Sequence, residues 1–223
     1  AFVRAGVAVV RLRVQRLTAD TSTYWDGSVP EWKENAVWLS TSPGWLYSVM
    51  PPWAHNVRYV VSAYALDGAG NQETDFALGV DTISVIFDML RPTATVLSPA
   101  PGGYMNAGNG PISGTADDAP ADIRSLEIAL SSSPTGAGSS WWNDTDFTAA
   151  FSDAVYRATT TYTNNPAGTP DAWNWTRPAN NKMETGKQYL VRLRARDGAV
   201  PGDSGYGNER PPSEQQYTFT YDA

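Results

Sequence analysis

The chain contains no cysteine, which excludes disulfide bridges, thiol catalysis and thiolate metal sites together. Histidine is almost as scarce, because His55 is the only one in the 223 residues. A lack of cysteine is typical of bacterial exported proteins that fold by core packing alone, although a cytosolic protein can lack cysteine too. Disulfide-independent folding is therefore the first property that the sequence establishes.

Long apolar runs are also missing. No stretch approaches the roughly 20 apolar residues that a membrane span needs, so we expect no membrane span in this segment. The net charge is −7 and the 16 basic residues are dispersed, so no basic stripe could neutralise phosphates and nucleic acid is not an expected partner. Neither a signal peptide nor a lipidation motif opens the chain at Ala1, which suggests a processed or excised piece.

One stretch of the sequence occurs twice. The segment Tyr59 to Asn71 reads YVVSAYALDGAGN, and Tyr189 to Gly198 reads YLVRLRARDG, 130 positions further along. Trp45 and Trp175 have the same separation, and we expect this matched pair to pack in the cores. The repeat predicts two domains, residues 1–91 and 92–223, and the 41% hydrophobic content is enough for two cores of that size.

Alternation of apolar and polar residues predicts β-strands throughout both copies. The proline-bracketed segment Thr93 to Ser98 fits an edge strand, whereas Thr159 to Ala172, rich in Thr, Asn, Pro and Gly, fits a surface loop. Because no amphipathic helix is evident, an all-β fold of antiparallel sandwiches is the economical prediction. The outer face of the second repeated strand is expected to be solvated, and it carries Leu190, Arg192, Arg194 and Arg196.

The first copy lacks a part of the second. Leu12 and Leu126 match at an offset of 114, which aligns Ala1 with Thr115 and leaves Pro92 to Gly114 without a counterpart. Those residues hold the first two predicted strands of the second copy. We therefore expect the first sandwich to lack its opening strands, with the natural chain continuing upstream or another chain donating a strand.

The ordered set of motifs resembles the immunoglobulin-like or fibronectin type III-like repeats of large bacterial surface and secreted proteins. The set runs from Pro92 through ISGTADD and IRSLEIAL to an aromatic–Asp turn and YLVRLRARDG, and the resemblance covers essentially the whole chain. Tyr59 and Tyr189 resemble the tyrosine of a tyrosine corner, whose hydroxyl bonds to backbone a few residues upstream. The resemblance implies an extracellular or cell-surface location and roles as a spacer, adhesin or accessory module, with no single activity.

Two kinds of binding site remain open. Trp141 and Trp142 are adjacent near a turn, so one ring should point outward, where with Asp144 it could stack on a glycan; core packing is the alternative. Clustered oxygens suggest calcium as a possible cofactor, although such residues also serve turns by binding backbone amides, with Gly70 and Asn71 then supplying positive φ. The calcium candidates are Asp67, Asn71, Asp197, Asp203 and Asn208.

Catalytic residues do not gather into a recognisable motif. His55 lies in a predicted loop without a G-x-S-x-G elbow, and the acidic pairs Asp117–Asp118 and Asp144–Asp146 lie in predicted turns. We therefore predict a non-catalytic structural or spacer module of a large exported protein, partnered by neighbouring repeats of the same or another chain. The alternatives are a carbohydrate-binding or adhesin module that uses exposed Trp, and an assembly subunit completed by strand donation.

Overall fold

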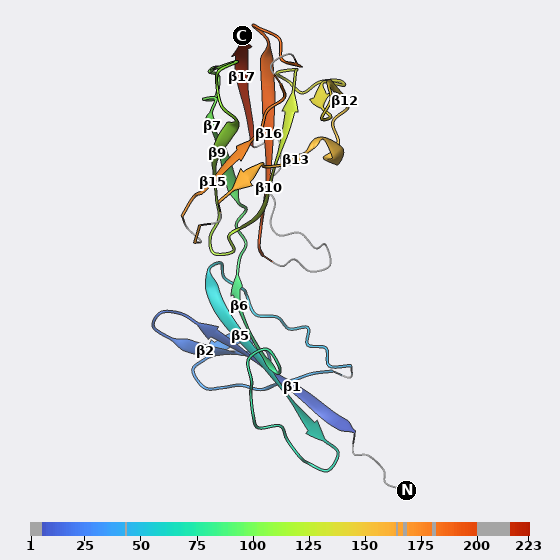
Figure 1. Ribbon diagram of the computed structural model, residues 1–223. Coiled ribbons are helices and arrows are strands. Elements are labelled where there is room, and N and C mark those ends of the chain that lie inside the picture. Colours follow the sequence, from blue (N-terminus) through green and yellow to red (C-terminus); the bar gives the residue numbers. More distant parts are fainter. Residues whose placement is uncertain (1–5, 43, 164, 167–168, 180–181, 200–214) are drawn as a thin grey trace. The chain divides into compact units, whose positions relative to one another are not determined.

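The computed structural model describes residues 6–42, 44–163, 165–166, 169–179, 182–199 and 215–223 (Figure 1). Within these residues the regular structure consists of strands and short 3₁₀ turns, which confirms the all-β class. The chain divides into two compact units, Ala1–Asp88 (unit 1) and Met89–Ala223 (unit 2). No helix in the described part has the length and apolar character that crossing a bilayer demands.

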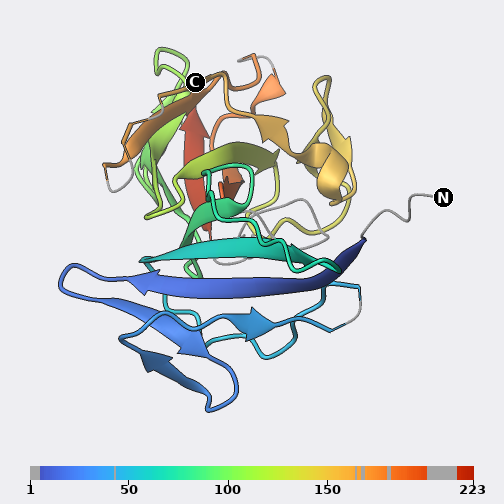
Figure 2. The same cartoon turned by 90° about the horizontal axis from the view of Figure 1, so that it is seen from below.

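Unit 1 builds a single sheet from its described residues, in the order β3-β2-β1-β5-β6, with β4 also pairing to β1. The two longest strands, β1 and β5, run antiparallel beside each other along their whole length (Figure 2). The bounds are β1 Val7–Leu17, β2 Ser22–Asp26, β3 Glu31–Lys33, β4 Leu39–Ser40, β5 Val57–Asp67 and β6 Thr82–Phe87.

Period-two alternation explains which face of this sheet is apolar. Leu12 lies opposite Ala63 and Val14 lies opposite Val61, so these side chains share one face, while the intervening arginines of β1 point to the other. The small core of unit 1 forms on the apolar face. Its buried members are Val14, Trp25, Leu39 and Tyr59.

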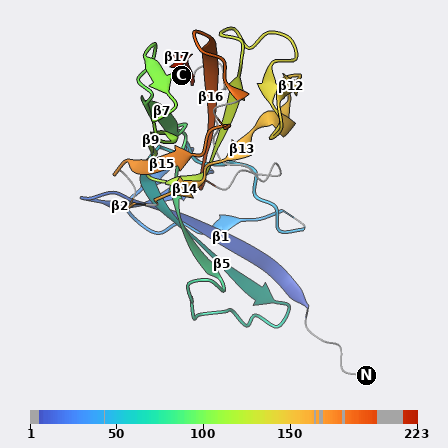
Figure 3. The same cartoon turned by 45° about the horizontal axis from the view of Figure 1, so that its top comes forward.

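The described residues of unit 2 form two sheets (Figure 3). A seven-stranded sheet has the order β12-β11-β10-β16-β17-β8 with β13 added to β10, and a four-stranded sheet has the order β14-β15-β9-β7. The bounds are β7 Thr93–Ser98, β8 Tyr104–Asn106, β9 Ile112–Asp117, β10 Ile123–Ser131, β11 Trp141–Trp142, β12 Phe147–Ala149, η1 Asp153–Val155, β13 Arg157–Ala158, β14 Thr161–Tyr162, β15 Asp171–Trp175, β16 Gln188–Asp197 and β17 Gln216–Asp222.

The two sheets of unit 2 pack around one common core, which makes this unit sandwich-like. The four-stranded sheet contributes Val96, Ile112 and Trp173 to that core, and the seven-stranded sheet contributes residues such as Ile128 and Val191. Strand β7 lies at the edge of its sheet, as its two flanking prolines predict. After β7 the chain changes sheets, and β8 pairs parallel to β17, the last strand.

A buried tyrosine is anchored in the same way in each unit. The Tyr59 hydroxyl accepts a hydrogen bond from the backbone N–H of Ala54 at 2.8 Å, and the Tyr189 hydroxyl accepts one from Glu184 N–H at 2.8 Å. Both donors lie five residues upstream, which confirms the hydrogen bond expected of a tyrosine corner. Burial raises the pKa of Tyr189, so its phenol stays neutral.

Two expectations about local structure are wrong. Residues 159–172 are not entirely loop, because β14 lies in that stretch, β15 begins in it, and the two strands pair. The matched tryptophans also differ, since Trp175 is buried in the core of unit 2 whereas Trp45 is 65% exposed in a turn. Trp175 lies on β15, which pairs with β9, and the described part of unit 1 has no strand in the place of β9.

We predict that Tyr189→Phe lowers the free energy of unfolding by about 0.5–1.5 kcal/mol, because the part-buried hydrogen bond from Glu184 N–H to the Tyr189 hydroxyl is lost. Tyr221 supplies the matched control, since its equally buried hydroxyl has no hydrogen-bond partner within the described residues. Urea unfolding of both variants measures the difference. Equal losses for Tyr189→Phe and Tyr221→Phe would contradict the anchoring role.

Candidate functional site

Both tryptophans of the predicted glycan site are buried in unit 2. Trp142 points into the common core and is 8% exposed, whereas Trp141 points to the opposite face of the sheet and is 0% exposed. The two rings do face opposite ways, but the expectation that one is exposed is wrong. Trp141 is covered because Val155, Tyr156 and Phe151 fold back over the outer face of the sheet.

Asp144, the third residue of that predicted site, lies in the turn between β11 and β12 with a φ of 77°. Its carboxylate accepts a hydrogen bond from Arg157 Nε at 2.5 Å. The Asp144 side chain remains largely exposed. The structure therefore does not present Trp141, Trp142 and Asp144 as one open aromatic platform, and glycan binding at these residues stays a prediction.

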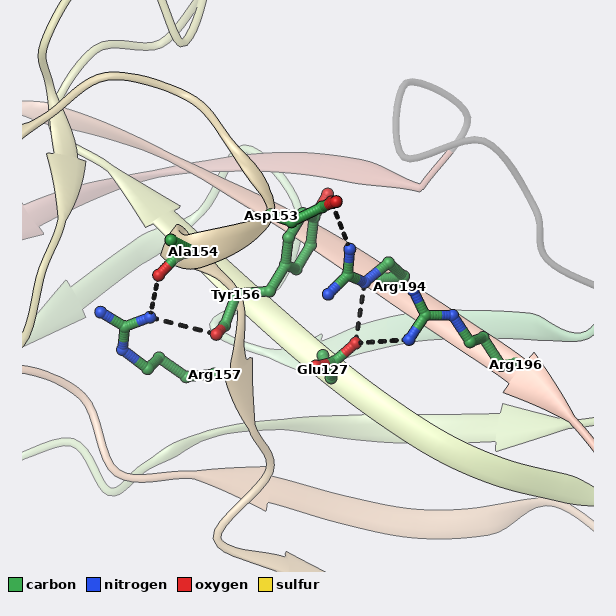
Figure 4. Close-up of polar contacts among 7 residues, drawn as sticks. All are labelled: Glu127, Asp153, Ala154, Tyr156, Arg157, Arg194 and Arg196. Atoms are coloured by element: carbon green, nitrogen blue, oxygen red, sulfur yellow. Dashed lines mark hydrogen bonds and ion pairs between the residues drawn. The ribbon is translucent and has the colours of Figure 1, made fainter. Parts of the chain in front are cut away.

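The outer face of β16 carries a polar cluster instead of a solvated row of arginines (Figure 4). Arg194 Nε donates to Glu127 Oε2 at 2.7 Å, and Arg194 Nη1 donates to Asp153 Oδ1 at 2.7 Å. The Arg194 guanidinium carbon also lies 4.0 Å from the centroid of the Tyr156 ring. Arg194 is only 6% exposed, so the expectation of a solvated face is wrong at this position.

Two neighbours complete this cluster. Arg196 Nη1 donates to the same Glu127 oxygen at 3.3 Å, and Arg157 Nη1 donates to the backbone carbonyl oxygens of Ala154 and Tyr156 (Figure 4). Burial by itself lowers the pKa of Arg194, but the hydrogen bonds and negative charges of Glu127 and Asp153 outweigh it and raise that pKa overall. The Arg194 guanidinium therefore stays positively charged, and its bond to Asp153 holds η1 against the sheet.

The outer face of the unit 1 sheet combines arginine and aromatic rings in a similar way. The Arg13 guanidinium carbon lies 4.8 Å from the centroid of Trp38, and the rings of Trp38 and Tyr64 meet edge to face at 4.5 Å. Trp38 in unit 1 and Tyr156 in unit 2 therefore each lie beside an arginine. The recurrence indicates a packing role for these cation–π contacts, because each arginine covers apolar ring surface.

The calcium candidates of unit 1 are occupied by turn hydrogen bonds. Asp67 Oδ1 accepts from the backbone N–H groups of Ala69 and Asn71, and Asp67 Oδ2 accepts from Asn71 Nδ2 at 2.8 Å. These hydrogen bonds lower the pKa of Asp67. Gly70 has a φ of 89°, as the turn interpretation expects, whereas Asn71 has no positive φ. The geometry therefore favours the turn role for Asp67 and Asn71.

The candidate Asp197 in unit 2 has a different environment. It is fully buried at the end of β16, and its Oδ1 accepts a hydrogen bond from Ala199 N–H at 3.0 Å. Asp118, which follows β9, brings a carboxylate oxygen to within 4.8 Å of one from Asp197. Two buried carboxylates so close repel each other, and a hard cation is one species that relieves the repulsion. Asp203 and Asn208 lie outside the described residues.

Sequence reasoning missed one buried carboxylate. Asp171, at the start of β15, accepts hydrogen bonds from the Tyr162 hydroxyl and from the backbone N–H of Asn165. Burial raises the pKa of Tyr162, and the hydrogen bond to Asp171 raises it further. The signal was weak, because Asp171 stands in a stretch whose composition predicts a loop.

The only histidine lies in a turn, as expected. His55 Nδ1 is 3.0 Å from Asp88 Oδ1, so this pair ties the turn before β5 to the residue that follows β6. The contact thus links the segments that flank two neighbouring strands, β5 and β6. This geometry gives His55 a structural position.

Comparison with protein-family models finds no match to the chain, and comparison with curated proteins finds none either.

We predict that Glu127→Gln lowers the free energy of unfolding by about 1–3 kcal/mol, because it removes the countercharge of a buried guanidinium. Asp153→Asn should cost about 0–1 kcal/mol, since the Asp153 side chain is almost fully exposed. Chemical denaturation of both variants tests the ranking. A larger loss for Asp153→Asn would show that Glu127 does not hold Arg194.

We also predict that Asp197, and not Asp67, is the position that binds calcium. Calcium at 100 times its dissociation constant should then stabilise the protein by about 2.7 kcal/mol. Asp197→Asn should abolish this gain while Asp67→Asn preserves it, with thermal unfolding in calcium, magnesium and a chelator as the measurement. An unchanged unfolding temperature in calcium would rule out the calcium prediction.

Proposed function

We propose that the chain is a non-catalytic structural module of a large exported protein, built from immunoglobulin-like units that sustain mechanical load. The observation that carries the proposal is the pairing of β8 with β17 in unit 2. These strands are parallel, and they lie near the start and at the end of the unit. Tension between the two ends of unit 2 therefore pulls β8 and β17 in opposite directions along their length. All the hydrogen bonds between the two strands then bear the force at the same time.

The strand order of unit 2 supports the immunoglobulin-like part of the proposal. In such domains strands A, B, E and D form one sheet, and strands C, F and G form the other, to which the variable type adds C′ and C″. The orders β7-β9-β15-β14 and β12-β11-β10-β16-β17 fit this pattern. Tyr189 then stands near the start of strand F, where the tyrosine corner belongs.

Unit 1 fits half of the same pattern. Its order β3-β2-β1-β5-β6 corresponds to C″-C′-C-F-G, with Tyr59 near the start of β5. This correspondence supports two tandem units of one fold, the first without its opening strands. Location at the cell surface, and a part in surface architecture or adhesion, follow from the resemblance to surface repeats and belong to the same proposal. Neighbouring repeats are the proposed partners.

A carbohydrate-binding function gains no support from Trp141 and Trp142, because their rings are buried. Trp45 is the most exposed tryptophan among the described residues, but a single ring in a turn does not define a sugar site. The mechanical proposal is therefore the one that the geometry favours.

We predict that Thr220→Pro lowers the force needed to unfold unit 2 in single-molecule stretching of the whole chain. This change removes the N–H of Thr220, which donates to the Gly103 carbonyl between β17 and the start of β8 at 2.9 Å. Thr163→Pro is the matched control, because it removes the hydrogen bond from Thr163 N–H to the Ala172 carbonyl, also 2.9 Å long, just after β14 and away from β8 and β17.

Each substitution should cost at least about 0.5–1.5 kcal/mol of stability, the usual worth of one hydrogen bond. Only Thr220→Pro should lower the unfolding force, since its bond lies on the line of tension. Equal effects of the two variants on the force would reject the mechanical role.

A further inference from the structure

One face of the unit 1 sheet exposes large apolar side chains. Ile83 and Val85 on β6 are 54% and 40% exposed, although they lie opposite Val61 and Tyr59 on the face that forms the core. Leu12, Val61 and Ala63 on the same face are only half-buried, whereas Val14 and Tyr59 beside them are buried. We call this surface the open face, and it consists of Leu12, Val61, Ala63, Ile83 and Val85.

Unit 2 shows what covers the same positions in the other copy. The register matches, because Tyr59 pairs with Val85 in unit 1 and Tyr189 pairs with Phe219 in unit 2. Four of the five counterparts are buried in the common core, and the fifth packs partly buried against it. The counterparts are Leu126, Val191, Leu193, Tyr217 and Phe219.

Strands β7 and β9 supply much of that cover. They present Ala94, Val96, Ile112 and Ala116 to the core, all small or branched and without charge. Strand β7 packs against β16 and β9 packs against β10, the counterparts of β5 and β1. Both strands precede β10 in the chain, with β8 between them, so the cover in unit 2 comes from the segment just before the strand that it covers.

We propose that the open face of unit 1 binds a two-stranded extended segment of the same polypeptide that acts as the counterpart of β7 and β9. The occupant carries small and branched apolar residues at alternate positions. The open face is apolar, and Val61 and Ala63 on β5 are short side chains that make it nearly flat. The repeat selects this occupant over a second copy of the chain, since unit 2 covers the matching face with its own preceding strands. The inference does not depend on the mechanical role proposed above.

The test supplies such a segment to the full chain. A copy of Pro92–Gly114 is fused directly before Ala1, because the repeat aligns Ala1 with Thr115. Hydrogen exchange read by mass spectrometry in β5 and β6 should slow by about tenfold or more, as expected for burying one or more further large apolar side chains. Binding of an apolar dye should fall in parallel.

Two matched controls keep the test decisive. In the first, Val96 and Ile112 are changed to Asp within the fused copy only, and the gain in protection should vanish. In the second, Ile83→Lys with Val85→Lys on the open face should leave the unfused chain folded, since both side chains are already exposed, yet abolish the gain from the fused copy.

Three outcomes would overturn the proposal. One is unchanged exchange in β5 and β6 of the fused chain, and another is equal protection by the intact and the Asp-substituted copies. The third is a dimer of the unfused chain that already protects β5 and β6 and that Ile83→Lys with Val85→Lys dissociates, because the occupant would then be a second copy. Light scattering with size exclusion detects such a dimer.

Discussion

A sheet with one apolar face is stable only when something keeps water from that face, and this constraint organises both units. The face is marked in each by a buried tyrosine, Tyr59 or Tyr189, whose hydroxyl fastens the chain five residues upstream. In unit 2 a second sheet completes the cover and the core extends across both layers. In unit 1 loop residues such as Val37 and Trp53 cover one part, and β6 keeps exposed isoleucine and valine.

The opposite faces of the sheets meet the same constraint with different chemistry. Arginines there lie over aromatic rings, so their alkyl stems and planar groups shield apolar surface while their charges find acceptors. Arg194 is the extreme case, because it is buried between Glu127 and Asp153. Trp141, which the sequence suggested as a binding residue, thus helps to hold the segment around η1 on the sheet.

The acidic turns show how one sequence motif takes two environments. Asp67 and Asp197 end equivalent strands, and each carboxylate accepts backbone N–H hydrogen bonds in the turn that follows. Asp67 stays near water, whereas Asp197 is buried with a second carboxylate, that of Asp118, close by. Burial changes the electrostatic cost of the same group, so Asp197 is the better position for a cation.

The all-β class and the long strands could be predicted from the sequence, because alternation of side chains and a repeated motif are local properties. The anchored tyrosines were expected from the resemblance to immunoglobulin-like repeats. The sequence also indicated that β7 is an edge strand, since its flanking prolines cannot donate to a ladder. Three features depend on tertiary contacts and could not be predicted from the sequence. They are the exposure of Trp45, the burial of both Trp141 and Trp142, and the ion pairs that bury Arg194. Each depends on whether a distant segment covers a given face, and alternation along one strand carries no information about that cover.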